Sequence, residues 1–437
     1  MPDAGFIAVP FRRLCLRMRP WYFMVNVADG KDMRIVVTGM GVISPIGIGI
    51  DAFWTAAVNG MNGVRRIKSF DASGQRSKIA GEIPGFDPVA YLPVKTIEQT
   101  DRFSQLALSA AALAVADAGG LAAYDPSRLA VSLGTGMGGY ATYEASAARY
   151  FRNQSTPPFT VLKTMANAAG AWIAITHQCK GPNLTFSTAC SSAGHAIGNA
   201  LQLLRNRQAD AVIAGGAEAC VLPLTMAGFN AMRALSTAYE DHPERASRPF
   251  SKGRDGFVMA EGAGILVLER EEDARRRGAD MHAVLAGYGS SCDAAHIVAP
   301  EHDGQVAAMG AAIADAGIDR GEVDYINAHA TSTPVGDIIE TRAIKAFFGD
   351  RSRDIAVSAT KSLFGHTIGA AAAIGSIATV MSLRSGIIHP TINFEEADPE
   401  CDLDYTPNEA RERAVQVGLC NAFGFGGNNV SLIFSNI

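Results

Sequence analysis

The sequence has few of the features that mark secreted, metal-binding or nucleic-acid-binding proteins. Its seven cysteines are an odd number among 437 residues, and no two of them form a CxxC pair. This spacing argues against a disulfide framework and against a zinc site. Basic residues are not in excess, since the net charge is −5, so the composition gives no support to nucleic-acid binding. We therefore expect a reducing, cytoplasmic setting, no metal and no nucleic-acid partner.

Long uncharged apolar runs are also scarce. The stretch Leu363–Leu383 has membrane-spanning length but is mostly Ala and Gly and contains His366, which favours a buried central helix over a transmembrane span. Residues 1–32 mix Arg with bulky apolar residues and contain no serine. They lack the uninterrupted apolar region of a signal peptide. We expect a poorly ordered extension there, a fold that begins at Met33, and no membrane association.

Segments of the second part of the chain repeat those of the first part in the same order. "MRIVVTGMGVIS" (Met33–Ser44) is matched by "MHAVLAGYGSSC" (Met281–Cys292), and "ADAVIAGGAEA" by "AVQVGLCNAFGFGG". The matches are weak one by one, but their common order indicates two α/β halves that arose by duplication. Continuous apolar strands predict sheets that are covered on both faces. We expect the halves to span 33–280 and 281–437.

A cysteine stands where a predicted strand gives way to a predicted helix, in "LTFSTACSSAGHAIGNAL" (Leu184–Leu201). One interpretation of Cys190 is packing, because free cysteine is often a small buried apolar residue. The other is chemistry. A helix N-terminus carries partial positive charge and unpaired N–H groups, so a thiol placed there ionises more readily, and the thiolate is the nucleophile. The local sequence leaves both interpretations open.

Other loops of the second half carry residues that are common in catalysis. His329 ends a predicted strand in "INAHATSTP", His366 follows "KSLFG", and Lys361 lies five residues before His366. Each residue also has an ordinary interpretation, as a hydrogen-bonded histidine, a helix cap or a surface charge. In a pseudo-symmetric α/β fold, however, these loops and the glycine-rich turn "FGFGG" can converge on one pocket with Cys190.

From Met33 to the C-terminus the chain resembles the β-ketoacyl-acyl-carrier-protein synthases of the elongating type (KAS I/II, here KAS II-like) in the thiolase superfamily. "TACSS", "NAHATSTP", "KSLFGHTIGAA" and "NAFGFGGNN" match the motifs of that family in order and spacing. The two histidines distinguish the chain from initiating synthases, which use Cys-His-Asn. The resemblance implies a thiolase-like fold whose duplicated α/β halves form a five-layered α-β-α-β-α core.

The resemblance implies an acyltransferase of fatty acid chain elongation. Cys190 would take the acyl chain, with the backbone N–H groups of Cys190 and Phe425 as its oxyanion hole. Met137, Phe229, Phe423 and Phe425 would line the acyl pocket. Two alternatives remain open: a ketosynthase of a specialised polyketide or polyene pathway, and a non-catalytic partner subunit, which the presence of Cys190 disfavours.

The same resemblance places the malonyl chemistry on the second half. Malonyl-acyl carrier protein would lose CO₂, and His329 and His366 would stabilise the resulting enolate. Lys361 would be a buried cation paired with Glu340. No cofactor is implied. The motif has Ala330 where the family usually has Gly, so this position would be strained if it needed a positive φ.

The implied partners are acyl carrier protein and a second copy of the chain. Lys95 and Arg233 match two carrier-docking cations of the family, and carrier proteins are acidic. Glu98 and Gln99 occupy positions that are often basic in the family, which weakens the expected steering. A homodimer with a large apolar interface near Met137 is expected.

Overall fold

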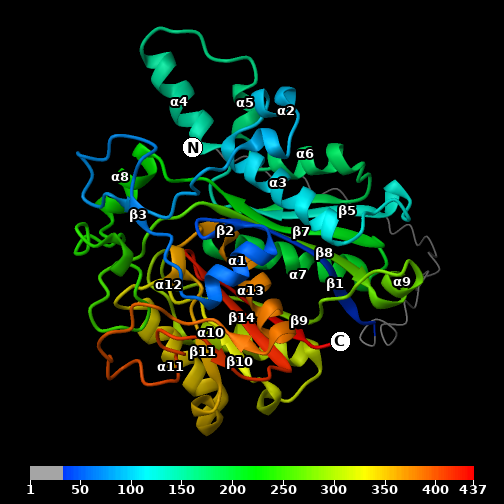
Figure 1. Cartoon of the computed structure of the whole chain (residues 1–437), viewed down its shortest axis with the longest axis vertical. Helices are drawn as coiled ribbons and strands as arrows, with labels where there is room; N and C mark the ends of the chain where they lie inside the picture. The colour runs from blue at the N-terminus through cyan, green and yellow to red at the C-terminus, as the bar shows by residue number, and fades with distance from the viewer. Residues whose placement is uncertain (1–32) are drawn as a thin grey trace, which may run out of the picture.

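The computed structural model describes residues 33–437 (Figure 1). The expected N-terminal extension, residues 1–32, lies outside the described residues. The main sheet has 11 strands: β1 (Ile35–Ser44), β2 (Gly47–Ile48), β5 (Leu129–Gly134), β6 (Asn183–Phe186), β7 (Ala211–Glu218), β8 (Gly262–Arg270), β9 (Ala283–Cys292), β10 (Tyr325–Asn327), β11 (Ala356–Ser358), β14 (Val417–Gly424) and β15 (Asn428–Ser435). Two short hairpins pair β3 (Arg65–Arg66) with β4 (Ile79–Ala80), and β12 (Ile387–Ile388) with β13 (Arg411–Glu412).

The order of the strands shows the duplication directly. The first half runs β1-β8-β7-β5-β6 and the second runs β9-β15-β14-β10-β11. In both halves the first two pairings are antiparallel and the last two are parallel. The halves join where Ile35–Val37 of β1 pairs with Ala283–Leu285 of β9. Each sequence match noted above falls on equivalent strands, so the prediction of two duplicated α/β halves is confirmed.

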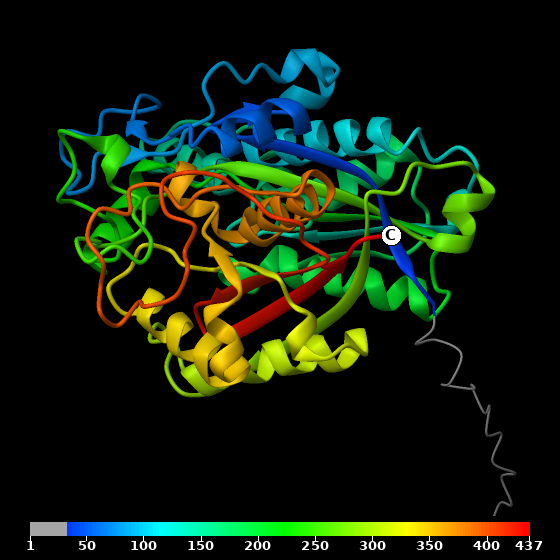
Figure 2. The ribbon, with the colours of Figure 1, turned by 60° about the horizontal axis from the view of Figure 1, so that its bottom comes forward.

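Helices cover both faces of each half-sheet, and Figure 2 shows the resulting layers. The outer helices of the first half are α3 (Arg102–Asp117) and α6 (Ala168–His177). Helices α7 (Ser192–Arg205) and α13 (Ala371–Ser385) lie together between the two half-sheets. On the far side α10 (His302–Ala316) packs on β9 and β15, and α11 (Gly336–Phe348) packs on α10. The five-layered α-β-α-β-α core is confirmed.

Small residues let the central helices fit between the two half-sheets. A Cβ atom at Gly194 of α7 would lie 2.8 Å from the Val430 side chain of β15, and one at Gly264 of β8 would lie 2.9 Å from the Ala373 backbone of α13. The apolar window Ile368–Ser385 is long enough to cross a membrane, but 83% of it is buried inside the protein. Together with α7 it forms the central layer, in agreement with the buried central helix that the composition predicts.

The remaining helices are short or peripheral. They are α1 (Ile50–Val58), α2 (Val94–Glu98), α4 (Tyr140–Phe151), α5 (Thr160–Thr164), α8 (Pro223–Ala231), α9 (Glu271–Arg276) and α12 (Lys361–Phe364). Of these, α12 bears on the site because it begins at the buried Lys361 and ends just before His366.

Candidate active site

Cys190 lies at the strand-to-helix junction that the sequence predicts. It occupies the 3₁₀ turn Ala189–Ser191, which leads directly into α7. Ala189 has a φ of 52°, a left-handed conformation that costs energy for a residue with a side chain. The Ser192 hydroxyl supports the turn by accepting the Thr188 N–H at 2.9 Å and donating to the Ala189 carbonyl at 2.6 Å. The turn therefore holds the Cys190 thiol in a fixed direction.

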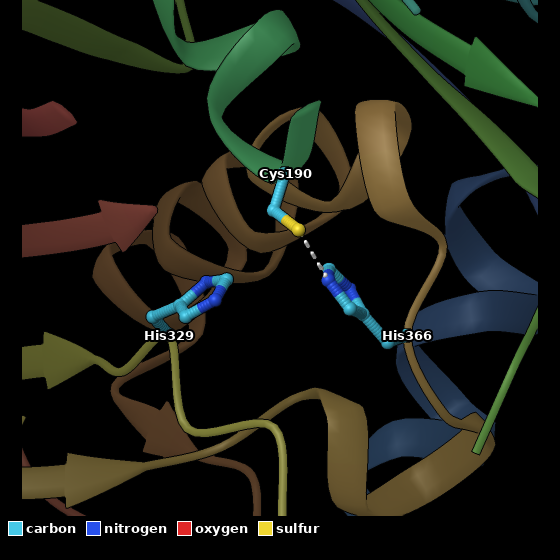
Figure 3. Close-up of side chains that lie close together, drawn as sticks. All are labelled: Cys190, His329 and His366. Atoms are coloured by element: carbon cyan, nitrogen blue, oxygen red, sulfur yellow. Dashed lines mark hydrogen bonds between the residues drawn. The ribbon is translucent and has the colours of Figure 1, made fainter. Parts of the chain in front are cut away.

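Two histidines from the second half converge on this thiol (Figure 3). His366 follows α12, and its Nε2 atom lies 2.9 Å from the Cys190 sulfur. His329 follows β10, and its ring stands at 85° to the His366 ring with the centroids 5.5 Å apart. One ligand-type atom from each of the three side chains lies within 4.8 Å of the others. The structure thus brings together the Cys and both His residues picked from the sequence.

Burial controls the charge of this group. Burial, and secondarily Lys361, lowers the pKa of His329 and of His366 well below the usual value, so both imidazoles are neutral at pH 7. The pKa of the Cys190 thiol is raised to about 12 by burial, against the opposing effects of Lys361 and of the backbone N–H of Phe425. Desolvation therefore opposes the ionisation that the helix start favours, and it is the larger of the two effects on the pKa of the Cys190 thiol. The thiol needs a base, and His366 is in hydrogen-bond contact with it.

Lys361 and Glu340 are both buried, but they do not form the expected ion pair. Among residues 33–437 no contact within 4.0 Å joins their charged atoms. The Glu340 carboxylate instead accepts the backbone N–H groups of His329 at 2.8 Å and Ala330 at 2.7 Å, and the Asn421 amide at 3.2 Å. Burial raises the pKa of Glu340 to about 7. Glu340 therefore fixes the backbone that carries His329. It acts on Lys361 only at longer range, where its negative charge opposes the lowering of the Lys361 pKa by burial.

The loop after β14 approaches Cys190 closely. A Cβ atom at Gly424 would lie 2.7 Å from the Thr188 carbonyl and 3.2 Å from the Cys190 nitrogen, so only glycine fits there. The backbone N–H groups of Phe425 and of Cys190 itself both favour the negative form of the sulfur. Gly426, on the other side of Phe425, has a φ of +81°. Two backbone N–H groups thus face the Cys190 sulfur, and the expectation that they form an oxyanion hole stays a prediction.

A cavity of about 590 Å³ connects these groups. Its lining includes the candidates Met137, Phe229, Phe423, Phe425, Glu340 and Arg233, in addition to Cys190, His329 and His366. The Phe229 ring stands edge-on to the Phe257 ring, with the centroids 5.4 Å apart, and Phe257 stands edge-on to the His366 ring, with the centroids 5.6 Å apart. A row of aromatic rings therefore leads from Phe229 to His366.

Two sequence expectations concern residues around this cavity. Lys95 is exposed on α2 but does not line the cavity, whereas Arg233 is exposed and lines it. Ala330 has no positive φ; Ser332, two residues later, has a φ of 70°. Alanine is therefore accommodated at position 330 without backbone strain.

Sequence reasoning missed Glu218, a fully buried carboxylate at the end of β7. It accepts the backbone N–H groups of Gly136 at 2.6 Å, Gly369 at 3.0 Å and Met137 at 3.2 Å, and the Thr135 hydroxyl at 3.1 Å. The signal was present in "AVIAGGAEA", where a carboxylate ends an otherwise apolar strand, since such a charge requires partners.

By donor type, the Cys190, His329 and His366 group could also hold a metal ion such as zinc. The expected absence of a metal stays a prediction.

Comparison with known proteins gives a consistent family assignment. The family description "Beta-ketoacyl synthase, N-terminal domain" matches residues 32–274, and "Beta-ketoacyl synthase, C-terminal domain" matches residues 282–395. The chain is 43% identical to a 3-oxoacyl-[acyl-carrier-protein] synthase 2 of Coxiella burnetii and 44% identical to one of Synechocystis. Each alignment covers 93% of this chain and 99% of the relative.

Solved structures of similar fold include enzymes of two kinds. A β-ketoacyl synthase from Burkholderia phymatum matches with a TM-score of 0.87 at 35% identity, covering 93% of this chain and 100% of that one. A ketosynthase of a type II polyketide synthase, in complex with its acyl-carrier protein and bound to the hexaketide, matches with a TM-score of 0.86 at 32% identity, covering 93% and 99%.

Proposed function

The chain belongs to the β-ketoacyl synthase family, and from that premise we propose that it condenses an acyl group held on Cys190 with malonyl-acyl carrier protein in fatty acid elongation. It is an acyltransferase that forms a carbon–carbon bond with loss of CO₂. The observation that carries the proposal is the meeting of Cys190 with two neutral histidines at the end of one apolar cavity. Its relatives at 43% and 44% identity are synthases of this reaction class.

The first half-reaction moves the acyl group to the protein. His366 Nε2 takes the thiol proton while the Cys190 sulfur attacks the thioester carbonyl of the acyl carrier protein. The backbone N–H groups of Cys190 and Phe425 hold the negative oxygen of the tetrahedral intermediate. The intermediate then expels the carrier thiolate, which leaves with the proton from His366, so that both imidazoles are neutral again.

The second half-reaction uses the malonyl group as the carbon nucleophile. Loss of CO₂ leaves two electrons as an enolate, whose oxygen accepts N–H bonds from His329 and from the neutral tautomer of His366 that carries its proton on Nε2. Its carbon attacks the acyl-Cys carbonyl, the C–S bond breaks, and Cys190 leaves as a thiolate. The thiolate takes one proton from solvent to regenerate the thiol, which is the proton that the decarboxylative reaction consumes overall. Glu340 orients His329 through the backbone, and Lys361 supplies a positive field next to both imidazoles.

The cavity provides the acyl and carrier subsites. Met137 and Phe229 bound the part of the cavity that receives the acyl chain. Phe425 belongs to the turn after β14 that moves to admit it, with Gly426 as a hinge, while Phe423 lines the cavity from β14 itself. Arg233 at the cavity lining and Lys95 on α2 meet the acidic carrier. A structurally similar ketosynthase is known in complex with its acyl-carrier protein.

We further propose a homodimer in the cytoplasm. Exposed apolar side chains are frequent between residues 143 and 184, in α4, in and beside α5, in α6 and in β6: Tyr143, Tyr150, Phe151, Phe159, Val161, Leu162, Met165, Ile175 and Leu184. Strand β6 ends the sheet path, so its outer edge is open to pair with a second copy. Patches of this kind mark interfaces. Separately, we propose that each chain divides into an N-terminal half, residues 33–280, and a C-terminal half, residues 281–437.

The test is reconstitution with defined carriers. The purified chain, mixed with hexanoyl- and malonyl-acyl carrier protein, should release CO₂ and form 3-oxooctanoyl carrier protein, both detected by mass spectrometry. EDTA should leave the rate unchanged because no step uses a metal. Release of CO₂ without a condensed product would contradict the proposal. A product only from polyketide intermediates would support the polyketide alternative, since one structural relative is the ketosynthase of a type II polyketide synthase.

A further inference from the structure

The Glu218 carboxylate joins two walls of the acyl cavity. One oxygen accepts the N–H groups of Gly136 and Gly369, and the other accepts the N–H of Met137 and the hydroxyl of Thr135. Gly136 and Met137 follow β5 in the first half, and Gly369 precedes α13 in the second half. One side chain therefore binds loops that lie more than two hundred residues apart in the sequence.

The backbones at Gly136 and Gly369 lie so close to the Glu218 carboxylate that neither position has room for a side chain. A Cβ atom at Gly136 would lie 2.8 Å from a Glu218 oxygen, and one at Gly369 would lie 2.7 Å from the same oxygen. The Gly369 Cβ would also lie 2.3 Å from the Gly136 nitrogen. A side chain at either glycine would push the loops apart, so the fit requires Glu218 and both glycines together.

The loops that Glu218 holds carry residues that touch the substrate cavity. Gly136, Met137 and Ile368 all line it, together with Cys190. Ile368 adopts a left-handed φ of 42° and lies between His366 and Gly369. The carboxylate thus fixes the spacing between Met137, on one wall, and Ile368, on the other.

Glu218 differs from buried carboxylates that only support the fold. Glu269, equally buried in β8, is paired with Arg277. No cation lies within ion-pair distance of Glu218 among residues 33–437, and burial raises the pKa of Glu218 to about 7. A charge this costly is held only by N–H and O–H donors from the cavity walls. We infer that Glu218 is a positioning residue that determines acyl-chain selectivity by fixing Met137 against Ile368, an inference that rests on the proposed condensing function.

The test is Glu218→Gln, which keeps the shape but presents an NH₂ group to donors that need an acceptor. We expect the ratio of kcat/KM for hexadecanoyl over hexanoyl carrier substrates to change by about tenfold, because a shift of the order of one methylene in an apolar pocket has that effect. Thr135→Val removes one donor with little change of volume and should move the ratio in the same direction. It serves as the second variant if Glu218→Gln folds poorly.

Glu269→Gln is the matched control, because it removes an equally buried charge that does not touch the cavity. It should lower the melting temperature and leave the chain-length ratio unchanged. The inference is overturned if Glu218→Gln and Thr135→Val lower stability but keep the wild-type ratio. Failure of the wild-type protein to form any β-ketoacyl product is a separate result, which would overturn the proposed function instead.

Discussion

The Nε2 atom of His366 lies 2.9 Å from the sulfur of Cys190, while the His329 ring faces His366 from across the cavity with centroids 5.5 Å apart. The two imidazoles are therefore not equivalent. His366 is hydrogen-bonded to the Cys190 sulfur. His329 is positioned instead through its backbone N–H group, which donates a hydrogen bond to the Glu340 carboxylate. Since burial raises the pKa of the Cys190 thiol, the contact with His366 offers a route for the thiol proton.

Cys190→Ala should abolish acyl transfer and leave the protein folded. The change removes one sulfur atom from a buried site without introducing a charge. Intact-protein mass spectrometry after mixing with acyl carrier protein should show no added acyl mass, and the melting temperature should stay near that of the wild type. Condensation at near the wild-type rate would rule out Cys190 as the acyl carrier.

His329→Ala should separate the two half-reactions. Removing one enolate donor should slow CO₂ release by about 10²–10³-fold, whereas acyl-Cys190 should still form because His366 keeps its contact with the sulfur. His366→Ala should slow both steps. Acylation by mass spectrometry and CO₂ release are measured side by side. If His329→Ala blocks acylation and leaves CO₂ release intact, the roles given to the two histidines are reversed.

Glu340→Gln should resemble His329→Ala in kind. The backbone N–H groups of His329 and Ala330 donate to different oxygens of the Glu340 carboxylate. Glutamine has only one acceptor oxygen, so one of the two N–H groups loses its partner. The loop should lose its fixed position, with a cost of about 1–3 kcal/mol for a buried donor left without a partner. We expect slower CO₂ release with acylation nearly unchanged. Equal loss of both activities would mean that Glu340 supports the whole fold rather than His329.

Much of this fold could be predicted because the duplication is still readable in the sequence. The segment from Met33 and the segment from Met281 match, and they form β1 and β9, which occupy equivalent places in the two half-sheets. The convergence of Cys190, His329 and His366 was predictable as well, since each stands in a distinctive loop motif and equivalent strand ends face one centre.

The electrostatics of the site could not be predicted in the same way. The sequence around Cys190 shows a helix start, but the desolvation of the thiol comes from segments far away, including Phe257 and Ile368, which pack in the same apolar cluster. The partners of Glu340 and Glu218 depend likewise on distant backbone N–H groups, which no local pattern reports. Long-range packing decides these pKa values and pairings, and it is visible only in the folded chain.

Charges placed on the apolar surface should prevent dimer formation. Leu184 of β6 is 45% exposed and Ile175 of α6 is 59% exposed. The double change Leu184→Asp and Ile175→Asp should give a monomer at micromolar concentration, because paired subunits would have to bury both carboxylates without partners. Sedimentation velocity measures the result, with Met61→Asp, at a 55% exposed site after α1, as the control. A dimer that persists in the double variant would place the interface elsewhere.

His389 should make the protein sensitive to acid. Its ring is fully buried, with Nδ1 3.0 Å from the Pro390 carbonyl and Nε2 3.1 Å from the Thr360 hydroxyl and 3.2 Å from the Ser358 hydroxyl. Burial lowers the pKa of His389 from 6.5 to about 4. Between these values the unfolded chain binds the proton and the folded chain does not, so stability falls as pH drops below 6.5.

The loss from this one residue should reach about 3 kcal/mol near pH 4, at about 1.4 kcal/mol per pH unit. His389→Gln removes the titration while an amide can still accept and donate hydrogen bonds in the same space. Urea unfolding at a series of pH values should therefore show that the free energy of unfolding of the variant depends less steeply on pH. The difference in slope should correspond to nearly one proton bound on unfolding, even if the variant is less stable at pH 8. An unchanged slope between pH 6.5 and pH 4 would show that His389 is not protonated on unfolding in that range, contrary to its buried position.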